Sequence, residues 1–467
     1  MSSPAQAPQQ QSSDGGDTIP NFLVLDQIPA NYSQQVETDL LEPVVFQQGT
    51  ETTDGFSRFT LQNKGFLHSH SKIFVALDPQ AGITNGFLQP HVGIGQIIKR
   101  AVLKIGNKTL NELDSWAGLH AVKSSLISNE NQLERELYMT GRYMNHKFKY
   151  NAGSRVFADK FGLDAGVEGS ATEDTLPTWA LMDTAKKAEC PSFMIDLSDL
   201  FPFLKVNQLP LYMIDEPINI ELTFQPTRDK RVQLSAGDTG GSACLIDRNE
   251  LKFCADYIYY GASDEMERYA AANQDMSFSF VDYRLVENST SDAALASGVI
   301  RNLGMANRIV PRVIATLPDT AASSDTLLGE NNSIAPTVNA SGVQTGYKFN
   351  VRYNDRYEFT TDVSSTARQF SIMTQSEGVP FVARQEFSNQ GTAGGVTTTT
   401  WQGRDQDASL GGKFFNMGTA LTNGRVGQRG IELHISGAFE GPDLVRCYCE
   451  YVRVARLSGG MFDLYNA

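Results

Sequence analysis

Apolar and polar residues alternate with a period of two in several parts of the chain. The alternation is clearest in residues 218–225, 347–354 and 431–436. Because a period of two places successive side chains on opposite faces of an extended strand, each stretch predicts an antiparallel strand with one buried face. Long polar stretches, such as residues 319–346 and 388–412, separate the strand-like segments. They exceed ordinary hairpin loops, so the pattern predicts a β scaffold that carries long loops.

Helical spacing of apolar residues is found in few places. The clearest helix is predicted at residues 115–139, with Asp114 positioned to cap its start and Gly141 to end it. A short helix is predicted at residues 263–272, where Ser263 can cap it and acidic residues follow at the positive end of the helix dipole. Strand-rich sequence lies on both sides of this short helix, so the predicted order is β domain, short helix, β domain.

Length and composition set limits on the class of protein. A chain of 467 residues is too long for one compact core, so we expect two or three domains. No run approaches the roughly 18 to 20 apolar residues of a membrane-spanning helix, so we expect no transmembrane segment. Residues 1–18 are rich in Ser, Pro, Gln, Gly and Ala and lack the basic start and apolar stretch of a secretory signal. They predict a flexible N-terminal arm, which is either a disordered leader without a role or a segment that becomes ordered only on a partner.

The charge balance argues against nucleic acid as a direct partner. The chain has 39 basic and 53 acidic residues, and a formal net charge of −14. No Lys or Arg precedes Arg58, whereas eight acidic residues do. Because neutralising phosphates requires a surplus of Lys and Arg, the N-terminal arm cannot act as a polycation on DNA. We therefore expect no direct, sequence-specific binding of nucleic acid.

The cysteines indicate a reducing environment. Their number is odd, and no Cys-x-x-Cys pair suggests a metal site. Cys447 and Cys449 lie two apart in a predicted strand, so their side chains point the same way and cannot easily form a disulfide. The sequence predicts buried free thiols in a protein made and assembled inside a cell. The five cysteines are Cys190, Cys244, Cys254, Cys447 and Cys449.

Three short motifs imitate catalytic or binding sites. Residues 238–240 read Asp-Thr-Gly, as in pepsin-like proteases, but no second copy completes a carboxylate pair, and a Gly-rich turn is the favoured interpretation. His68 and His70 would share one face of a strand, but no third metal ligand lies nearby in the sequence. The glycines of residues 91–95 lack the rest of a dinucleotide fingerprint. We therefore predict no catalytic residues, no cofactor, no metal site and no enzymatic activity.

Four segments, in order along the chain, resemble parts of one known family. One of them is a strand followed by the short helix. It resembles the segment that joins the two halves of double jelly-roll major capsid proteins. These are the capsid proteins of nucleocytoplasmic large DNA viruses, virophages and polinton-like viruses. The residues of this structural linker motif are Asp256, Tyr257, Ile258, Tyr259, Asp264, Glu265 and Arg268.

The other three segments resemble further parts of the same family. Residues 193–203, followed by 208–211 and 216–222, look like the strand pair that closes the first jelly roll. Residues 114–142 look like the helical insertion of polinton-like and virophage capsid proteins, and residues 451–461 resemble the last strand and tail of the family. The residues of this C-terminal strand motif are Tyr451, Val454, Arg456, Gly459 and Met461.

The resemblance implies an all-β fold. Two consecutive eight-stranded antiparallel jelly-roll sandwiches would be joined by a short helix, with long loops and a helical insertion at about residues 114–140. The expected parts are a flexible N-terminal arm at 1–18, a first jelly roll at 19–262, a linker helix at 263–274 and a second jelly roll at 275–467.

The resemblance also implies a structural function, that of a major capsid protein. Homotrimeric capsomers with a pseudo-hexagonal outline would tile an icosahedral virion shell that encloses double-stranded DNA. The partners would be further copies of the chain, neighbouring capsomers, and penton and minor capsid proteins. The location would be the virion capsid, assembled inside the infected host cell. The polinton-like or virophage-like subgroup is favoured.

A carbohydrate-binding jelly roll, such as a viral attachment protein or lectin, is the alternative function. Trp116, Trp179 and Trp401, together with sixteen Tyr residues, could supply aromatic faces for sugars. Trp116 falls in the predicted helix, and Trp179 closely follows Pro177. Only Trp401 lies in a long polar loop, and no Asp/Asn cluster with the spacing of calcium ligands accompanies it.

Overall fold

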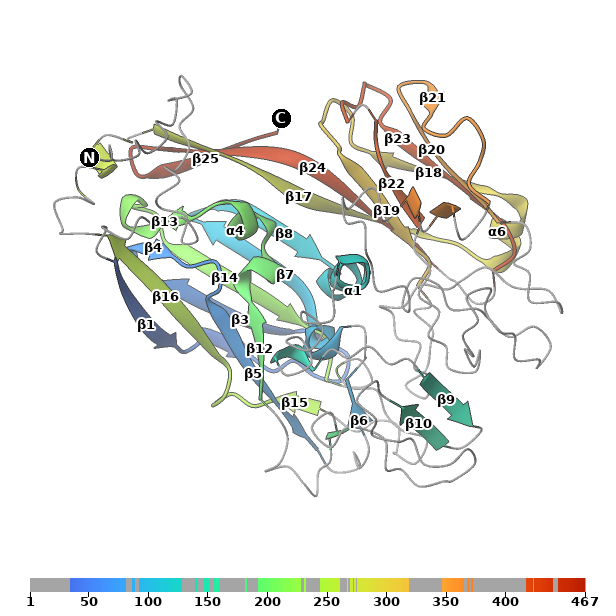
Figure 1. Cartoon of the computed structure of the whole chain (residues 1–467). Helices are drawn as coiled ribbons and strands as arrows, with labels where there is room; N and C mark the ends of the chain where they lie inside the picture. Colours follow the sequence, from blue (N-terminus) through green and yellow to red (C-terminus); the bar gives the residue numbers. More distant parts are fainter. Residues whose placement is uncertain are drawn as a thin grey trace, which may run out of the picture.

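The fold consists of two β-sandwiches, one from each half of the chain (Figure 1). We call the strands between residues 34 and 260 the first unit and those between residues 275 and 466 the second unit. The N-terminal arm lies outside the described residues. The structure, a computed structural model, describes residues 34–80, 86–88, 92–127, 139–141, 147–151, 154–158, 181–182, 192–227, 231, 244–260, 267, 269–271, 273, 275–318, 347–364, 368–369, 371–372, 417–422, 424–439 and 444–466.

The first unit packs a seven-stranded sheet against a five-stranded sheet. In the larger sheet the order is β12-β5-β16-β4-β13, with β1 added on β16 and β15 added on β5. Its strands are β1 (Gln34–Leu41), β4 (Phe66–Leu67), β5 (Lys72–Pro79), β12 (Ser192–Asp196), β13 (Leu209–Pro210), β15 (Cys244–Ile246) and β16 (Lys252–Tyr260). The smaller sheet has the order β2 (Val45–Gln47), β3 (Gly55–Leu61), β14 (Ile218–Phe224), β7 (Ile98–Ile105) and β8 (Lys108–Asp114).

Two small two-stranded sheets accompany the first unit. They are β6 (Gly86–Phe87) with β11 (Leu181–Met182), and β9 (Lys147–Asn151) with β10 (Ser154–Ala158).

The second unit packs a five-stranded sheet against a four-stranded sheet. The larger sheet has the order β17 (Asp275–Ser289), β24 (Leu444–Ser458), β19 (Arg312–Thr316) and β22 (Met417–Ala420), with β25 (Met461–Asn466) added on β24. The smaller sheet has the order β18 (Val299–Gly304), β23 (Ile431–Ser436), β20 (Lys348–Tyr353) and β21 (Arg356–Tyr357). All pairings in both units are antiparallel.

The strands predicted from alternation are confirmed. β14 and β23 have strictly alternating burial, and β20 covers most of the third predicted stretch. Their buried residues, such as Ile220 and Leu433, belong to the two hydrophobic cores, one for each unit.

The helices of the structure are short. The longest, α1, covers Trp116–Ile127, and residues 139–140 are again helical before Gly141, whose φ is +68°. α6 (Asp292–Ser297) begins after Ser291, whose side chain accepts a hydrogen bond from the backbone N–H of Ala294. The other short helices are η3 (Gly93–Ile97), α3 (Leu197–Leu200), α4 (Pro202–Val206) and η6 (Leu211–Met213).

The predicted cap of the first helix is wrong by one residue. Asp114 is the last residue of β8 and makes an ion pair with Arg100 at 3.1 Å instead of capping α1. The turn into the helix is made by Ser115, which has a φ of +50° and whose carbonyl accepts from the N–H of Gly118 at 3.1 Å. A carboxylate held by an arginine on the neighbouring strand is not available for capping.

Three strand predictions also need correction. Of residues 193–203 only those up to Asp196 are strand; α3 and α4 follow, because Pro202 at the first turn of α4 favours a helix start. β12 and β14 lie in different sheets, so they do not form a pair. Residues 62–65 connect β3 to the short strand β4, and residues 68–71 connect β4 to β5. Residues 451–461 contain the end of β24 and the start of a further strand, β25.

Candidate functional site: the junction between the two sandwiches

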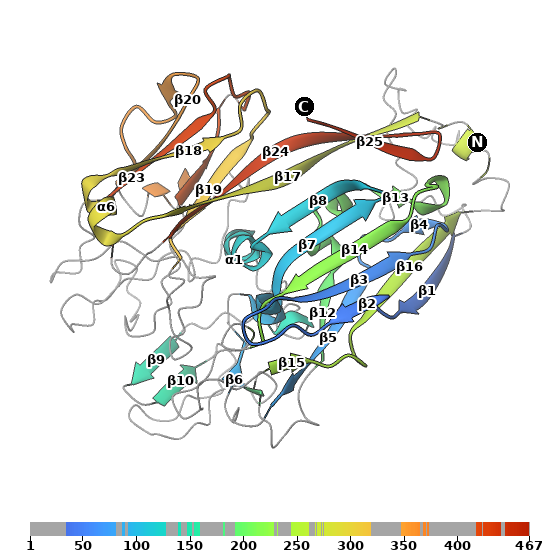
Figure 2. The same cartoon turned by 180° about the vertical axis from the view of Figure 1, so that it is seen from behind.

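A long ribbon of strands runs through the junction between the two sandwiches. β17 and β24 pair over 15 residues, and β25 continues the pairing on the other side of β24. Figures 1 and 2 show this ribbon leaving the second unit and passing over β8 and β13 of the first. One end of the ribbon contributes to the first hydrophobic core and the other end to the second. The two sandwiches are therefore connected through shared cores.

Aromatic rings anchor the ribbon on the first unit. Phe278 and Phe280 of β17 meet the ring of Phe203 from α4 edge-on, with centroids 5.6 and 5.1 Å apart. Phe462 of β25 stacks on Phe278 at 5.8 Å. All four rings are buried. Burial of large aromatic side chains is a major source of stabilisation, so this cluster holds the second unit on the first.

At the junction, β24 is covered on both faces. Its residues 445–451 are all buried, whereas a strand with one wet face would alternate. Cys447 and Cys449 point into the second core, and Tyr448 between them belongs to the first core. The prediction that the two cysteines share one face is thus confirmed. The four cysteines within the described residues are free, and three of them are buried.

A buried carboxylate links the ribbon to β8. Asp282 of β17 is 2% exposed and accepts hydrogen bonds from Arg453 at 2.8 Å, from the Tyr451 hydroxyl at 3.2 Å and from the Asn111 amide at 3.1 Å. The side-chain oxygen of Asn111 in turn accepts from the backbone N–H of Phe203 at 2.9 Å. Burial raises the pKa of Asp282, although the charge of Arg453 opposes the shift. The cluster joins β8, α4, β17 and β24 at one point.

A second charged cluster connects α1 with the second unit. Glu450 of β24 accepts a hydrogen bond from the Tyr283 hydroxyl at 2.6 Å and lies 3.4 Å from Lys123 of α1 and 3.8 Å from Arg312 of β19. Lys123 also donates to the Tyr283 hydroxyl. Burial alone would raise the pKa of Glu450, but the positive charges of Lys123 and Arg312 outweigh burial and lower it. Glu450 is therefore a buried carboxylate held in its charged form.

The start of α1 fits closely against β24. The Tyr448 hydroxyl donates to the carbonyl of Ser115 at 3.0 Å, and a Cβ placed on Gly118 would lie 2.6 Å from the Tyr448 oxygen. A side chain larger than hydrogen at position 118 does not fit beside this hydroxyl. Trp116, next to the turn, is 2% exposed and donates through its indole N–H to the carbonyl of Asp199 at 3.0 Å. Its burial removes it as a sugar-binding platform.

The C-terminal strand motif lies in the same ribbon. Its residues Tyr451, Val454 and Arg456 belong to β24, Gly459 to the turn, and Met461 begins β25. Tyr451 is the residue of this motif that enters the Asp282 cluster. Further along the hairpin, the backbone N–H of Asp215 donates to the carbonyl of Gly460 at 3.0 Å, and that of Phe462 donates to the carboxylate of Glu216 at 3.2 Å. Lys108 pairs with Asp463 at 3.0 Å.

The linker motif begins on β16, in the interior of the first unit. Tyr257 is fully buried, and Lys64 lies over its ring at 4.6 Å. Lys64 also pairs with Glu37 at 2.6 Å and Asp39 at 2.7 Å, and these hydrogen bonds raise its pKa. The hydroxyl of Tyr259 donates to Glu37 at 3.1 Å. This strand motif therefore holds the acidic edge strand β1.

The helical half of the linker motif is described only in part. Residues 267 and 269–271 are helical, and Tyr269 packs its ring against Phe66 of β4 with centroids 6.1 Å apart. Asp256 and Ile258 lie on β16. Asp264, Glu265 and Arg268 lie outside the described residues, as do Cys190, the Asp238 motif, Trp179 and Trp401.

His68 and His70, the candidate metal pair of the sequence, lie in the connection between β4 and β5 and not on a strand face. His68 accepts a hydrogen bond from the backbone N–H of His70 at 2.9 Å, and His70 lies 3.4 Å from the carboxylate of Asp196. Burial and the proximity of His70 lower the pKa of His68. Within the described part of the chain no group of three or more potential ligands could hold a metal ion.

Sequence reasoning missed the charged residues of the junction. The available signal is a charge inside an otherwise apolar strand: Glu450 and Arg453 interrupt β24, and Asp282 follows the alternating phenylalanines of β17. Such a charge must find a partner when buried. The sequence does not say which partner.

Comparison with known proteins gives matches at the level of structure. No protein-family model matches the chain, and no curated protein matches it. The quasi-atomic model of the PBCV-1 virus capsid has a TM-score of 0.56 at 10% identity, with 94% of this chain and 98% of that chain covered. The cryo-EM structure of the Sputnik virophage has a TM-score of 0.53 at 10% identity, with 100% and 93% covered. The mavirus major capsid protein has a TM-score of 0.51 at 9% identity, with 100% and 96% covered.

These similarities extend over both units and over nearly the full length of each capsid protein. Short additional strands, such as β4, β13 and β21, extend the sheets beyond the expected eight strands per unit. The predicted fold class is confirmed: the chain has the double jelly-roll fold that is found in the major capsid proteins of large DNA viruses and virophages.

Proposed function

We propose that the chain is a structural major capsid protein that forms homotrimeric, pseudo-hexagonal capsomers, and that these tile an icosahedral shell around double-stranded DNA. The junction carries the proposal. Two similar sandwiches held through shared cores form one body, so three copies around a three-fold axis place six similar sandwiches in a ring. A ring of six sandwiches gives the trimer an almost hexagonal outline. In a hexagonal lattice, such a trimer has six neighbouring trimers.

The buried charge clusters support a role in a capsid shell because they fix the angle between the two sandwiches. Asp282 and Glu450 each bind groups from both units, and every hydrogen bond in such a cluster depends on direction. In a lattice, an error in the angle between the sandwiches would be repeated at every capsomer. A hinge at the junction would therefore oppose closed assembly, whereas a locked junction favours it.

The proposal keeps the division into an arm at 1–18, a first jelly roll at 19–262, a linker at 263–274 and a second jelly roll at 275–467. Its partners are other copies of the chain, neighbouring capsomers, and penton and minor capsid proteins. Its location is the virion capsid, built inside the infected cell, and its role is structural rather than catalytic. Among the described residues no helix is long and apolar enough to cross a membrane.

Electron microscopy of the purified full-length chain tests this function. We expect two-dimensional averages with a hexagonal outline and three-fold symmetry, and ordered arrays at high protein concentration. A matched variant, Arg453→Met, removes the hydrogen bonds of Arg453 to Asp282 and to the carbonyl of Leu110, at a side chain that is only 15% exposed. We expect it to give fewer hexagonal particles. Averages that show two separate lobes at variable angles would contradict the proposal.

A further inference from the structure

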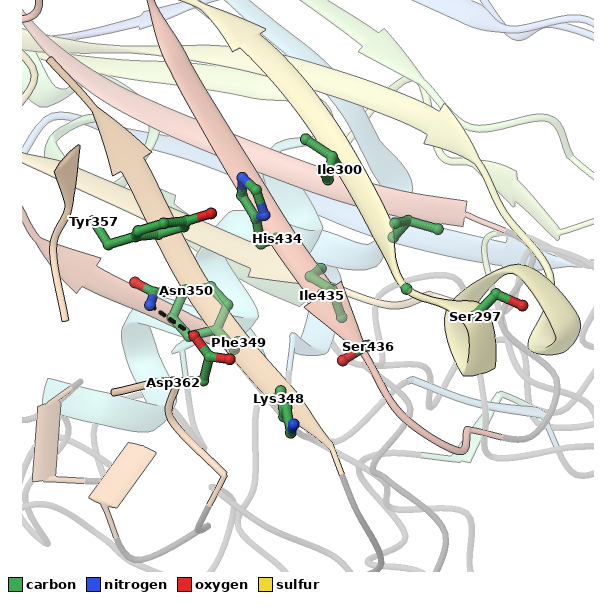
Figure 3. Close-up of a pocket in the computed structure, with 12 residues that line it drawn as sticks. Ser297, Ile300, Lys348, Phe349, Asn350, Tyr357, Asp362, His434, Ile435 and Ser436 are labelled. Atoms are coloured by element: carbon green, nitrogen blue, oxygen red, sulfur yellow. Dashed lines mark hydrogen bonds between the residues drawn. The ribbon is translucent and has the colours of Figure 1, made fainter. Parts of the chain in front are cut away.

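The outer face of the smaller sheet in the second unit contains a cavity of about 300 Å³ (Figure 3). Strands β18, β20 and β23 form its floor, and β21 and the segment around Asp362 form its rim. The volume is at the lower end of the range for small-molecule sites in proteins. None of the residues of the junction contributes to this cavity.

The strand register explains which side chains reach the cavity. Val299, Phe349 and Ile435 are buried in the second core, so their neighbours along the strands point to the outer face. Ile300 pairs with His434, and His434 pairs with Asn350, which places these three in one row across the sheet. In the next row Lys348 pairs with Ser436. One apolar side chain, one aromatic side chain and several polar side chains therefore lie next to one another at the cavity.

The polar groups of the cavity are held in place and balanced in charge. The amide of Asn350, which is 3% exposed, donates to one carboxylate oxygen of Asp362 at 2.8 Å and to the carbonyl of Phe359 at 3.1 Å. Its side-chain oxygen accepts from the backbone N–H of Val351 at 2.9 Å. Asp362 and Lys348 make no ion pair with any described residue, so one negative and one positive group line the cavity. A ligand without net charge suits this pair.

An exposed aromatic ring completes the site. Tyr357 of β21 is 49% exposed, and its ring is T-shaped with that of His434, with the centroids 5.3 Å apart. Ile300 on the other side of His434 is 61% exposed. Figure 3 shows Tyr357, Asn350 and Asp362 on one side of the cavity and Lys348 and Ser436 on another.

We propose that this cavity binds a neutral sugar residue. The apolar C–H face of a sugar ring can pack on an exposed aromatic ring such as that of Tyr357. Its hydroxyl groups both donate and accept hydrogen bonds, and they match the acceptor of Asp362, the donors of Lys348 and the hydroxyl of Ser436. A purely apolar ligand would leave these polar groups unpaired, and a ligand with a net charge of either sign would meet a like charge, on Asp362 or on Lys348. The site goes beyond the shell function, because a lattice subunit has no need to bind a sugar.

Saturation-transfer NMR with the full-length protein tests the proposal. The probes are the methyl glycosides of glucose, galactose, mannose and N-acetylglucosamine, each added alone. We expect at least one to receive saturation from the wild-type protein. Tyr357→Ala should raise its dissociation constant at least tenfold, whereas Tyr357→Phe, which keeps the ring, should change it less than threefold. Tyr465→Ala is the matched control, because Tyr465 on β25 is 53% exposed and lies outside the cavity.

A second variant keeps the test decisive if Tyr357→Ala does not fold. Asp362→Asn removes the negative charge and replaces one carboxylate oxygen by a donor, and it should also raise the dissociation constant at least tenfold. The absence of saturation transfer to all four glycosides in the wild-type protein would overturn the proposal. So would an equal loss of binding in Tyr465→Ala. If Tyr357→Ala lowers the solution mass of the assembly without any sugar binding by wild type, the face is a protein contact and the proposal fails.

Discussion

Arg453 of β24 donates to the carboxylate of Asp282 on β17 at 2.8 Å, at the place where the ribbon passes from the first core to the second. Phe280 is the direct partner of Arg453 in the strand register, so the ion pair runs diagonally across the ribbon. Arg453 also donates to the carbonyl of Leu110 in β8 at 3.0 Å. One arginine thus joins both strands of the ribbon to the first unit.

Removing the carboxylate of this pair should destabilise the protein strongly. Asp282→Ala leaves Arg453, whose side chain is 15% exposed, without its charged partner. Loss of one member of a buried pair costs about 3 kcal/mol or more, because the remaining charge stays desolvated. Unfolding by urea, followed by circular dichroism, measures the change.

A second ion pair on the same two strands supplies the control. Arg456 and Asp275 lie 3.4 Å apart, but both side chains are about half exposed. Asp275→Ala should therefore lower the free energy of unfolding much less than Asp282→Ala does, as expected for a pair at the surface. Equal losses in the free energy of unfolding for Asp282→Ala and Asp275→Ala would contradict the assigned role of the buried pair.

The two buried carboxylates of the junction should respond to acid in opposite directions. The pKa of Glu450 is lowered from 4.5, so the folded state holds its proton less tightly than the unfolded chain does, and its contribution to stability is lost as the pH falls below 4.5. The pKa of Asp282 is raised from 3.8, so its contribution favours folding at low pH and is lost as the pH rises through the folded-state value.

Melting temperatures between pH 3 and pH 7 can separate these two contributions. As the pH falls, the stability of wild type should decrease relative to Glu450→Gln and increase relative to Asp282→Asn, because each amide variant removes one titrating group. Parallel curves for wild type and Glu450→Gln would show that Glu450 is not held in its charged form by Lys123 and Arg312.

The sequence predicted much of the β scaffold, for a clear physical reason. Alternation identifies a strand with one buried face, and β14 and β23 are such strands. β24 is different, since residues 445–451 are buried on both faces by two different cores. A pattern of apolar residues shows that a face is buried, but it does not show which core buries it.

The candidate site was less accessible to sequence reasoning. The two family motifs include Tyr451 and Tyr257, but the charges that lock the junction come from distant parts of the chain. Lys123 and Glu450, for example, are separated by 327 positions. Local chemistry also misled the prediction of the helix cap, because Asp114 is a good capping residue that Arg100 holds on β8.

The close contact between α1 and β24 gives a further prediction. Gly118→Ala places a methyl group against the Tyr448 hydroxyl and should cost about 1–3 kcal/mol, the usual cost of overpacking. In the Tyr448→Phe background the hydroxyl is absent, so the same substitution should cost clearly less. A double-mutant cycle on thermal unfolding measures the difference, and equal costs in both backgrounds would contradict the contact.

Arg231 offers a test in the first unit, away from the junction. It is fully buried, and it donates to the carbonyls of Gln48, Gln225 and Cys244 at 2.6, 2.8 and 3.2 Å. Burial lowers its pKa to about 10, so it remains charged at neutral pH. Arg231→Lys cannot reach all these carbonyls and should cost about 2–3 kcal/mol, because buried acceptors lose their donors.

Arg429→Lys is the matched control for this substitution, since the Arg429 side chain is 77% exposed. It should change the free energy of unfolding by no more than about 0.5 kcal/mol. Chemical denaturation of both variants measures the difference. A similar small effect for Arg231→Lys would mean that the guanidinium does not hold the ends of β2 and β14 and the strand β15 together.

The central claim is that two locked sandwiches per chain build a trimer, and the solution mass of the purified protein tests it most directly. Light scattering after gel filtration should give one species at about three times 51.2 kDa, near 154 kDa. The outer-surface control Asp275→Ala should keep this mass. A stable species of 51.2 kDa at all concentrations would contradict the account.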